Sequence, residues 1–286
     1  MRFPYHDLSI VIPTYRESGN LTALFQRIES ALATTDLNSE ILVVDDNSND
    51  GTEQLCREHP SSIPIELIVR QQERGLSSAV LRGFESARGE VLLVMDADLS
   101  HPPECIPAMV DTLLASSTEC PRVDMVIGSR YVQGGSTTEN WGWARWVNSK
   151  IATALARPFT SANDPMAGFF AMRRTAFEEA SGRLDPIGYK IGLELIVKCH
   201  FDVVKEVPIR FTNRTVGESK LSLREQLNYL THLKRLASYQ MGRSGGGQQE
   251  SDSTSDECPS VAGTIRPAEL KITNEEVRRD FGSRAA

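Results

Sequence analysis

Two acidic residues, separated by one alanine, follow directly after an apolar run in the stretch VLLVMDADLSHPPE, residues 91–104. The run at 91–95 has the length and composition of a buried strand, so Asp96 and Asp98 would stand at its carboxyl end. Two carboxylates at this spacing can hold a divalent cation, and the cation can bridge the oxygens of a diphosphate. Residues 102–104 are also typical of a helix start, where acids act as caps. The pair alone leaves both interpretations open.

Polar residues also follow three other apolar runs. They read PTYRE from residue 13, DDNSNDGT from residue 45 and GSRY from residue 128. In open parallel α/β sheets the ligand binds beyond the carboxyl ends of the strands, so these residues would face one crevice. They add an aromatic ring, amide and hydroxyl groups and a guanidinium to the carboxylate pair. This combination favours the metal site over the helix cap.

Two common phosphate-binding motifs are absent from the sequence. A dinucleotide-binding sheet carries G-x-G-x-x-G after its first strand, and a P-loop reads G-x-x-x-x-G-K-[ST]. Neither occurs in this chain. A diphosphate in the crevice would therefore need another partner for its charge, and Mg²⁺ or Mn²⁺ on the carboxylate pair fits that need.

The elements that would position these residues alternate along the chain. Apolar runs of strand length alternate with residues at helical spacing, which is the pattern of a parallel sheet with crossover helices. The runs are too continuous for half-exposed strands, which indicates helices on both faces. Strands are predicted at 8–12, 40–44, 65–69, 90–95, 124–128, 166–172 and 203–211, and helices at 21–32, 76–84, 191–198 and 223–239. We therefore expect an α/β fold with a mostly parallel sheet.

The composition limits the class of protein. With 286 residues, 40% hydrophobic and 24% charged, the chain has the composition of a globular protein of one large or two small domains. No apolar run approaches the roughly 20 residues of a membrane-spanning helix and no secretory signal is visible, so we expect a cytoplasmic protein. The net charge of -7 disfavours nucleic-acid binding. The five cysteines form no C-x-x-C pair, which disfavours a zinc site or a disulfide framework.

Two segments differ in composition from the α/β pattern. Residues 141–159, WGWARWVNSKIATALARPF, mix aromatic and cationic side chains. This mixture suits a helix at a membrane interface, and it equally suits a core-facing helix beside the site. Residues 241–286 include a polar low-complexity stretch and are expected to form a disordered tail after a folded domain at 1–240.

Eight motifs stand in order along about residues 7–239. They read PTYRE, VVDDNSNDGT, RGLSSAVLRGFESARGE, VMDADLSHPPE, GSRY, DPMAGFFAMRR, GYKIGLELIVK and VPIRFTNRTVGESKLS. In this order they closely resemble the dolichyl-phosphate (polyprenyl-phosphate) mannosyltransferases of glycosyltransferase family 2, of the type without attached membrane-spanning helices. The resemblance implies the GT-A fold, with a Rossmann-like sheet, and transfer of mannose from GDP-mannose to dolichyl or polyprenyl phosphate.

The resemblance also implies roles for residues at the donor site. It places five residues around the guanosine part of GDP-mannose: Pro13, Tyr15, Glu17, Val44 and Asp46. It makes Asp96 and Asp98 ligands of Mg²⁺ or Mn²⁺, with the backbone of Ala97 beside the nucleotide. Ser100 stands where some relatives carry Gln and is the expected third metal ligand. Arg16 replaces a common Asn, and this change is expected to matter little.

Five further residues correspond to family positions that contact phosphate groups. On the donor side these are Arg130, Arg214 and Lys220, and on the acceptor side Arg145 and Ser149. The planar fork of an arginine side chain suits phosphate oxygens. Asp96, Asp98 and Arg214 are the residues expected to act in catalysis.

The resemblance bears on mechanism as well. The chain lacks the E-D pair and the later Q-x-x-R-W that supply a carboxylate base in the polysaccharide synthases of family 2. A lipid monophosphate needs no base, because its second pKa of about 6 leaves it largely dianionic at neutral pH. We therefore expect a single displacement that inverts the anomeric carbon. The expected partners are the cytoplasmic face of a membrane and a membrane-anchoring protein.

Three alternatives stay open. The same fold and motifs could serve another donor, such as UDP-glucose. A phosphohydrolase with the first Asp of D-x-D as nucleophile is disfavoured, because that motif usually follows the first strand and here it follows the fourth. A sensor that binds the sugar nucleotide without turnover is the third, and the intact acids disfavour it.

Overall fold

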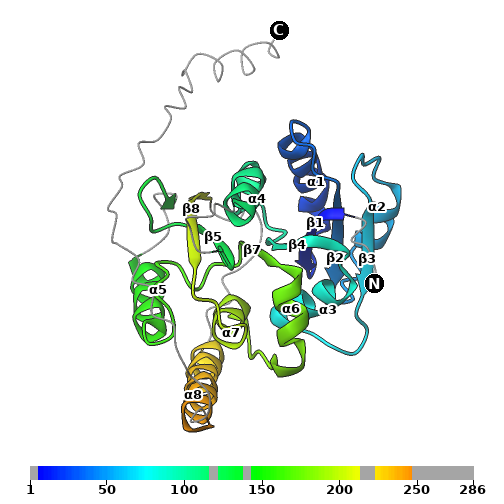
Figure 1. Cartoon of the computed structure of the whole chain (residues 1–286). Coiled ribbons are helices and arrows are strands. Elements are labelled where there is room, and N and C mark those ends of the chain that lie inside the picture. The colour runs from blue at the N-terminus through cyan, green and yellow to red at the C-terminus, as the bar shows by residue number, and fades with distance from the viewer. Residues whose placement is uncertain (1–5, 116–121, 138–142, 213–222, 247–286) are drawn as a thin grey trace. The chain divides into compact units, whose positions relative to one another are not determined.

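A seven-stranded sheet forms the centre of the fold (Figure 1). The computed structural model describes residues 6–115, 122–137, 143–212 and 223–246. The strands lie in the order β3-β2-β1-β4-β7-β5-β8. Their bounds are β1 (His6–Thr14), β2 (Ser39–Asp45), β3 (Ile65–Val69), β4 (Gly89–Val94), β5 (Met125–Ser129), β7 (Phe170–Arg173) and β8 (Val204–Pro208). A two-stranded sheet pairs β6 (Ser136–Thr137) with β9 (Arg210–Phe211).

Helices cover both faces of the large sheet, as the continuous apolar runs predict (Figure 1). One face packs on α1 (Ser18–Leu32), α2 (Thr52–Glu58) and α4 (Ile106–Leu114), and the other on α3 (Leu76–Ser86), α6 (Arg174–Ala180) and α7 (Ile191–Lys198). Short 3-10 helices occupy Pro103–Cys105 and Ser181–Arg183. A third apolar cluster joins α7 to α5 (Trp143–Ala156) and α8 (Leu223–Gly246). None of the helices in the described part of the chain is both long and apolar enough to cross a bilayer.

The strand order creates a switch point between β1 and β4. From β1 the chain proceeds to β2 and then β3 on one side, whereas β4 returns to pair with the other side of β1. These pairings are parallel, so the carboxyl ends of β2, β1 and β4 share one edge. A crevice at such a point is the usual ligand site of an open α/β sheet. The predicted α/β class with a mostly parallel sheet is confirmed.

The strand β7 is the exception to the parallel pattern. It lies between β4 and β5 and runs antiparallel to both. Its amino end therefore lies at the edge of the sheet where its neighbours end. The residues that precede β7 consequently meet the residues that follow β4 and β5.

The structure corrects the predicted burial of two strands and the boundaries of three elements. The outermost strands β3 and β8 are only partly buried, because each has a neighbour on one side alone. The strand expected at 166–172 begins at Phe170, because a turn with Ala167 N donating to Asp164 O precedes it. The run 203–211 splits at the buried Ile209 into two strands of different sheets. Helix α8 continues to Gly246, past the expected start of the tail, and 247–286 lie outside the described residues.

The described cysteines behave as small apolar residues. Burial raises the pKa of Cys56 to about 11 and that of Cys199 to about 12. Both thiols therefore stay protonated at neutral pH and have little nucleophilic character. Burial also raises the pKa of Cys105, and the remaining two cysteines lie outside the described residues.

Helix α3 packs closely on β1 and β2 at Gly83. A Cβ at this position would overlap Val11 Cγ1 and would lie 3.0 Å from Val11 Cγ2 and 3.2 Å from Val44 Cγ2. The absence of a side chain lets the helix rest directly on the two strands whose carboxyl ends enter the crevice. By contrast, Gly19 in α1 faces open space, with no atom within 4 Å of an added Cβ.

We predict that Gly83→Ala destabilises the fold although alanine favours helices. The added methyl group overpacks the interface between α3 and the sheet, which costs about 1–3 kcal/mol. Chemical denaturation measures this as a lower free energy of unfolding. Gly19→Ala is the matched control, and we expect it to be neutral or stabilising. Equal stability of the two variants would contradict the close packing at Gly83.

Candidate functional site

The two carboxylates of the D-A-D sequence lie in the loop that follows β4. The side chain of Asp96 is 26% exposed, whereas Asp98 is only 4% exposed. Ser100 donates to Asp98 Oδ1 from its backbone N at 3.0 Å and from its hydroxyl at 2.5 Å. Leu99 takes a positive φ of 61° in this turn. Ser100 is therefore a support for Asp98 in the structure, and its role as a metal ligand stays a prediction.

The surroundings of Asp96 fit a divalent cation that is shared with a ligand. A Cβ at Gly168 would lie 3.4 Å from both carboxylate oxygens of Asp96, so glycine leaves space there. Among the described residues no group of three or more His, Cys, Asp or Glu could hold a metal ion. Mg²⁺ and Mn²⁺ accept such open sites, because one or two carboxylates suffice when phosphate oxygens and water complete the shell. Asp96 and Asp98 supply oxygen donors of this kind.

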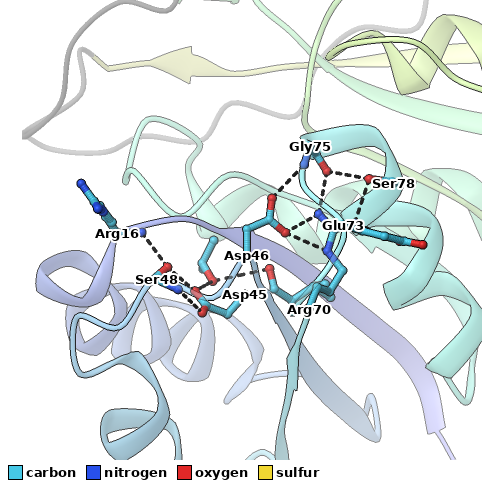
Figure 2. A network of polar contacts seen from close by, with 10 residues as sticks. Arg16, Asp45, Asp46, Ser48, Arg70, Glu73, Gly75 and Ser78 are labelled. Atoms are coloured by element: carbon cyan, nitrogen blue, oxygen red, sulfur yellow. Dashed lines mark hydrogen bonds and ion pairs between the residues drawn. The ribbon is translucent and has the colours of Figure 1, made fainter.

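Asp46 follows β2 and is held by Arg70, which follows β3 (Figure 2). Arg70 Nε donates to Asp46 Oδ1 at 2.7 Å, and Nη2 forms a second, shorter bond to the same oxygen. Gly75 N donates to Asp46 Oδ2 at 2.8 Å. The side chain of Arg70 is only 5% exposed. Asp46 thus enters the crevice as one half of a buried ion pair, and sequence analysis missed the other half.

The neighbouring Asp45 points to a different set of donors (Figure 2). It accepts from the Thr14 hydroxyl at 3.0 Å and from Ser48 N at 2.8 Å. The Ser48 hydroxyl in turn accepts from Arg16 N at 2.8 Å. These bonds fasten the loop after β2 to the loop after β1. The two loops are therefore held in a fixed relation at the switch point.

Tyr15, at the end of β1, is in contact with two guanidinium groups. The Arg16 and Arg74 Cζ atoms lie 5.2 Å and 5.4 Å from the centre of its ring. Such cation–π contacts stabilise a ring in one orientation. Arg16, whose difference from the family pattern was expected to matter little, thus touches a predicted donor residue. Glu17 at the start of α1 accepts from Asn20 Nδ2 at 2.7 Å.

Three predicted donor residues are buried. Pro13 lies inside β1, and Ala97, between the two carboxylates, is 3% exposed. The side chain of Val44 has no exposed surface and belongs to the core under α3. The structure therefore exposes no part of Val44 to a ligand, and its contact with the nucleotide stays a prediction.

Arg130 follows β5 and pairs with Asp164, which precedes β7. Its Nε and Nη2 donate to the two carboxylate oxygens of Asp164 at 2.7 Å each. These bonds raise the pKa of Arg130 above its usual range although burial opposes the charge. Glu206 of β8 accepts from Asp164 N at 3.0 Å and from Asn163 N at 2.9 Å. A phosphate at Arg130 would therefore share this guanidinium with a fully buried carboxylate.

The described part of the predicted acceptor site centres on Tyr131. Its hydroxyl and that of Ser149 lie 2.8 Å apart and share a hydrogen bond. Lys150 Nζ lies 4.1 Å above the Tyr131 ring, and Arg130 Cζ lies 5.2 Å from it. Two cations and two hydroxyl groups are thus gathered between β5 and α5. The backbone of Arg145 lies in α5, but its side chain is outside the described part of the structure.

The remaining predicted phosphate contacts, Arg214 and Lys220, lie in 213–222, outside the described residues. The described residue just before them is attached to the carboxylate loop. Thr212 donates to Ser100 O from its N at 3.1 Å and to Leu99 O from its hydroxyl at 3.0 Å. The chain therefore enters this segment beside Asp98.

His101 is a buried residue of the site that the sequence analysis passed over. Its Nδ1 accepts a hydrogen bond from Asp96 N at 3.1 Å, and its Nε2 lies 3.9 Å from Asp96 Oδ2. The ring is 3% exposed. Burial lowers the pKa of His101 and outweighs the nearby carboxylates, which favour the protonated ring. The charges that act on it belong to Asp96, Asp98, Arg130 and Asp164.

The missed residues differ in how visible they are in the sequence. Arg70 stands directly after the predicted third strand, and His101 stands inside the quoted D-A-D stretch. Both could have been found by applying the strand-end rule to every strand and loop. Asp164 precedes a strand, and only the antiparallel direction of β7 brings it to Arg130.

We predict that Arg70→Met strongly destabilises the protein. The change leaves the Asp46 carboxylate buried without its cation, and breaking such a pair costs about 3–5 kcal/mol. Urea denaturation followed by circular dichroism measures the loss. The control is Arg82→Met, which removes an exposed arginine paired with Glu85 at 3.4 Å and should change stability by about 0.5 kcal/mol or less. Similar effects of the two changes would mean that the Asp46 pair contributes no more than a surface pair.

Comparison with known proteins shows to which family the chain belongs. The model of "Glycosyl transferase family 2" matches residues 9–180. A dolichol-phosphate mannosyltransferase of Pyrococcus furiosus is 44% identical over 237 residues, covering 82% of this chain and 64% of that protein's length. Enzymes of the same name from Mycosarcoma maydis and Saccharomyces cerevisiae are 41% and 37% identical, each over 82% of this chain and over 80% and 89% of their own lengths.

Solved structures support the fold at lower sequence identity. Glucosyl-3-phosphoglycerate synthase from Mycobacterium tuberculosis, in complex with Mn²⁺, UDP and glucosyl-3-phosphoglycerate, matches with a TM-score of 0.56 and 18% identity. The match covers 84% of this chain and 81% of that one. With the sheet order described above, it confirms the predicted GT-A fold. The chain therefore belongs to glycosyltransferase family 2 and, within it, to the family of the dolichol-phosphate mannosyltransferases.

Proposed function

We propose that the chain transfers mannose from GDP-mannose to dolichyl or polyprenyl phosphate, with inversion, to give polyprenyl β-mannosyl phosphate. The observation that carries the proposal is the similarity to relatives named for this activity, at 37–44% identity over 82% of the chain. The chain spans about 64% of the length of the Pyrococcus furiosus relative. The proposal therefore concerns the reaction of the catalytic fold that the two proteins share.

The donor would lie across the switch point between β1 and β4. Tyr15 and the Asp46–Arg70 pair stand at the nucleoside end, and Asp96 and Asp98 at the diphosphate end. Mg²⁺ or Mn²⁺ held by these two carboxylates would neutralise charge on the departing diphosphate. If Ser100 is a third ligand, its hydroxyl oxygen would bind the cation while its hydroxyl group continues to donate a hydrogen bond to Asp98 Oδ1.

The acceptor phosphate would lie between β5 and α5. Tyr131, Ser149 and Lys150 gather there, and Arg130 adjoins them. By their place in the family pattern, we include Arg145 in the contacts to the acceptor phosphate, and Arg214 and Lys220 in the contacts to the donor phosphates. Positive charge at this end would hold the two anionic substrates together against their repulsion.

The displacement needs no proton transfer. An oxygen of the lipid phosphate dianion forms a bond to the anomeric carbon, and the bond from that carbon to the GDP oxygen breaks on the opposite face. Asp164, a carboxylate near the acceptor side, is bound on both oxygens by Arg130 and has no part as a base. The role of this chain is to orient two phosphates and to stabilise the charge that develops on GDP.

A lipid acceptor requires contact with a membrane, which we place at the cytoplasmic face. The described part of α5 exposes two apolar side chains, Ile151 at 54% and Leu155 at 41%. On α8, Leu227 and Leu230 are 65% and 52% exposed. Apolar side chains of this kind are typical of helices that lie at an interface. They support peripheral attachment, directly or beside a membrane-anchoring protein.

A transfer assay tests the proposal. The purified chain, a short polyprenyl phosphate and Mn²⁺ should convert radiolabelled GDP-mannose, and not UDP-glucose, into a lipid-linked sugar. Chelation with EDTA should abolish the product, and added Mn²⁺ or Mg²⁺ should restore it. Asp98→Asn should lower the rate by about 100-fold or more. The control Asp111→Asn, an exposed residue on α4, should leave it unchanged.

The outcomes of this assay separate the alternatives. Exclusive use of UDP-glucose would overturn the proposed donor, and the proposed lipid phosphate acceptor would still hold. Metal-dependent binding of GDP-mannose without any lipid product would favour a sensor. Product formation in the presence of EDTA would show that the reaction needs no divalent metal ion.

We predict that the rate follows the ionisation of the acceptor. Because the second pKa of a phosphate monoester is about 6, kcat/KM for the lipid phosphate should rise between pH 5 and about 6.5 and then level off. Initial rates at subsaturating acceptor measure this profile. As a control, the dissociation constant of GDP with Mn²⁺ should be determined at each pH. A rate that keeps rising in proportion to hydroxide above pH 7 would indicate a base with a higher pKa on the enzyme.

A further inference from the structure

We propose that His101 is a positioning residue for the metal site, which holds the backbone of Asp96 so that its carboxylate faces the cation. The inference rests on the proposed metal-assisted function and adds a residue to it. His101 would not touch the substrate or the cation. It would act through Asp96.

The first observation is where the strand ladder ends. Met95 N still donates to Val11 O of β1 at 3.2 Å, but the next amide, that of Asp96, lies beyond the last pairing of β4 with β1. His101 Nδ1 accepts from this amide at 3.1 Å. The His101 side chain therefore holds an amide that no longer takes part in the pairing of β4 with β1.

The second observation is that the His101 ring packs against two aromatic side chains and lies close to Gly168. It stacks on Phe169, with centroids 5.3 Å apart and planes inclined by 18°, and meets the edge of Phe211 at 5.5 Å. A Cβ at Gly168 would lie 3.5 Å from His101 Cε1 and 3.4 Å from the oxygens of Asp96. The ring and the carboxylate therefore converge on one point of the segment before β7.

The acceptor role fixes the tautomer of the ring. An Nδ1 that accepts from a backbone amide carries no proton, so the proton of the neutral ring is on Nε2. Nε2 lies 3.9 Å from Asp96 Oδ2, which is too long for a direct hydrogen bond. The ring consequently bonds to the Asp96 backbone and makes no direct hydrogen bond to the carboxylate. Groups that orient a metal ligand in this way commonly affect metal affinity about 10–100-fold.

Three variants separate this role from that of an ordinary core residue. His101→Phe keeps a ring between Phe169 and Phe211 but has no acceptor. His101→Asn places an amide oxygen near the position of Nδ1, and His101→Gln carries the same amide one carbon further along. Each is measured for Mn²⁺ affinity in saturating GDP by the EPR signal of free Mn²⁺, for GDP affinity in EDTA, and for thermal unfolding without ligands.

We expect His101→Phe to weaken Mn²⁺ binding about 10–100-fold while GDP affinity in EDTA stays within about twofold of the unaltered protein. His101→Asn should recover most of the Mn²⁺ affinity, and His101→Gln should not. If the Phe variant fails to fold, the Mn²⁺ affinities of the Asn and Gln variants still test the inference. Both variants carry the same amide group, so they differ only in where that group lies.

Several results would overturn the inference. These are unchanged Mn²⁺ affinity in His101→Phe, equal affinity in the Asn and Gln variants, or a parallel loss of GDP affinity in EDTA. The binding assay contains neither sugar nor lipid. It therefore tests the role of His101 even if the protein does not transfer mannose. If the unaltered protein shows no metal-dependent GDP binding, this inference and the metal-assisted mechanism fall together.

Discussion

The arrangement of the site depends on keeping charges ionised at the ends of buried strands. A charge in such a place is costly unless a partner or hydrogen bonds compensate it. Asp46 is compensated by Arg70 and Gly75 N, Arg130 by Asp164, and Asp98 by Ser100. These contacts hold the loops after β2, β4 and β5. The partners that compensate the charges are thus residues of the fold itself.

This constraint separates the two ends of the crevice. At the end where we propose the nucleoside binds, a buried arginine holds the acid, so the charges of Asp46 and Arg70 largely cancel. Around Tyr131 the cations Lys150 and Arg130 gather, although Asp164 balances one of them. Between the two, Asp96 and Asp98 contribute negative charge. This order of charges is the one expected for the proposed substrates, which are a neutral base, a cation-bound diphosphate and an anionic acceptor.

Much of this could be predicted from the sequence, because apolar runs and the polar residues after them are local signals. The strands of the large sheet, the helices α1, α3, α7 and α8 and the position of the carboxylate pair were predicted in this way. Pairings such as Arg130 with Asp164 could not be, since they depend on where β7 inserts in the sheet and in which direction. The division of 203–211 at Ile209 could not be predicted either. The apolar pattern continues through this residue, although β9 belongs to a second sheet. The roles of Arg145, Arg214 and Lys220 stay predictions.

The antiparallel course of β7 has a consequence for how this catalytic fold can be varied. In the proposed function, the donor residues Tyr15, Asp46, Asp96 and Asp98 lie no later than the loop after β4, whereas the acceptor residue Ser149 lies between β5 and β7. Because β7 presents its amino end to the crevice, the segment between β5 and β7 is tied at both ends to the same edge of the sheet. Under the proposed function, exchange of this segment between relatives is expected to change the contacts to the acceptor, while Tyr15, Asp46, Asp96 and Asp98 keep their places at the ends of the other strands.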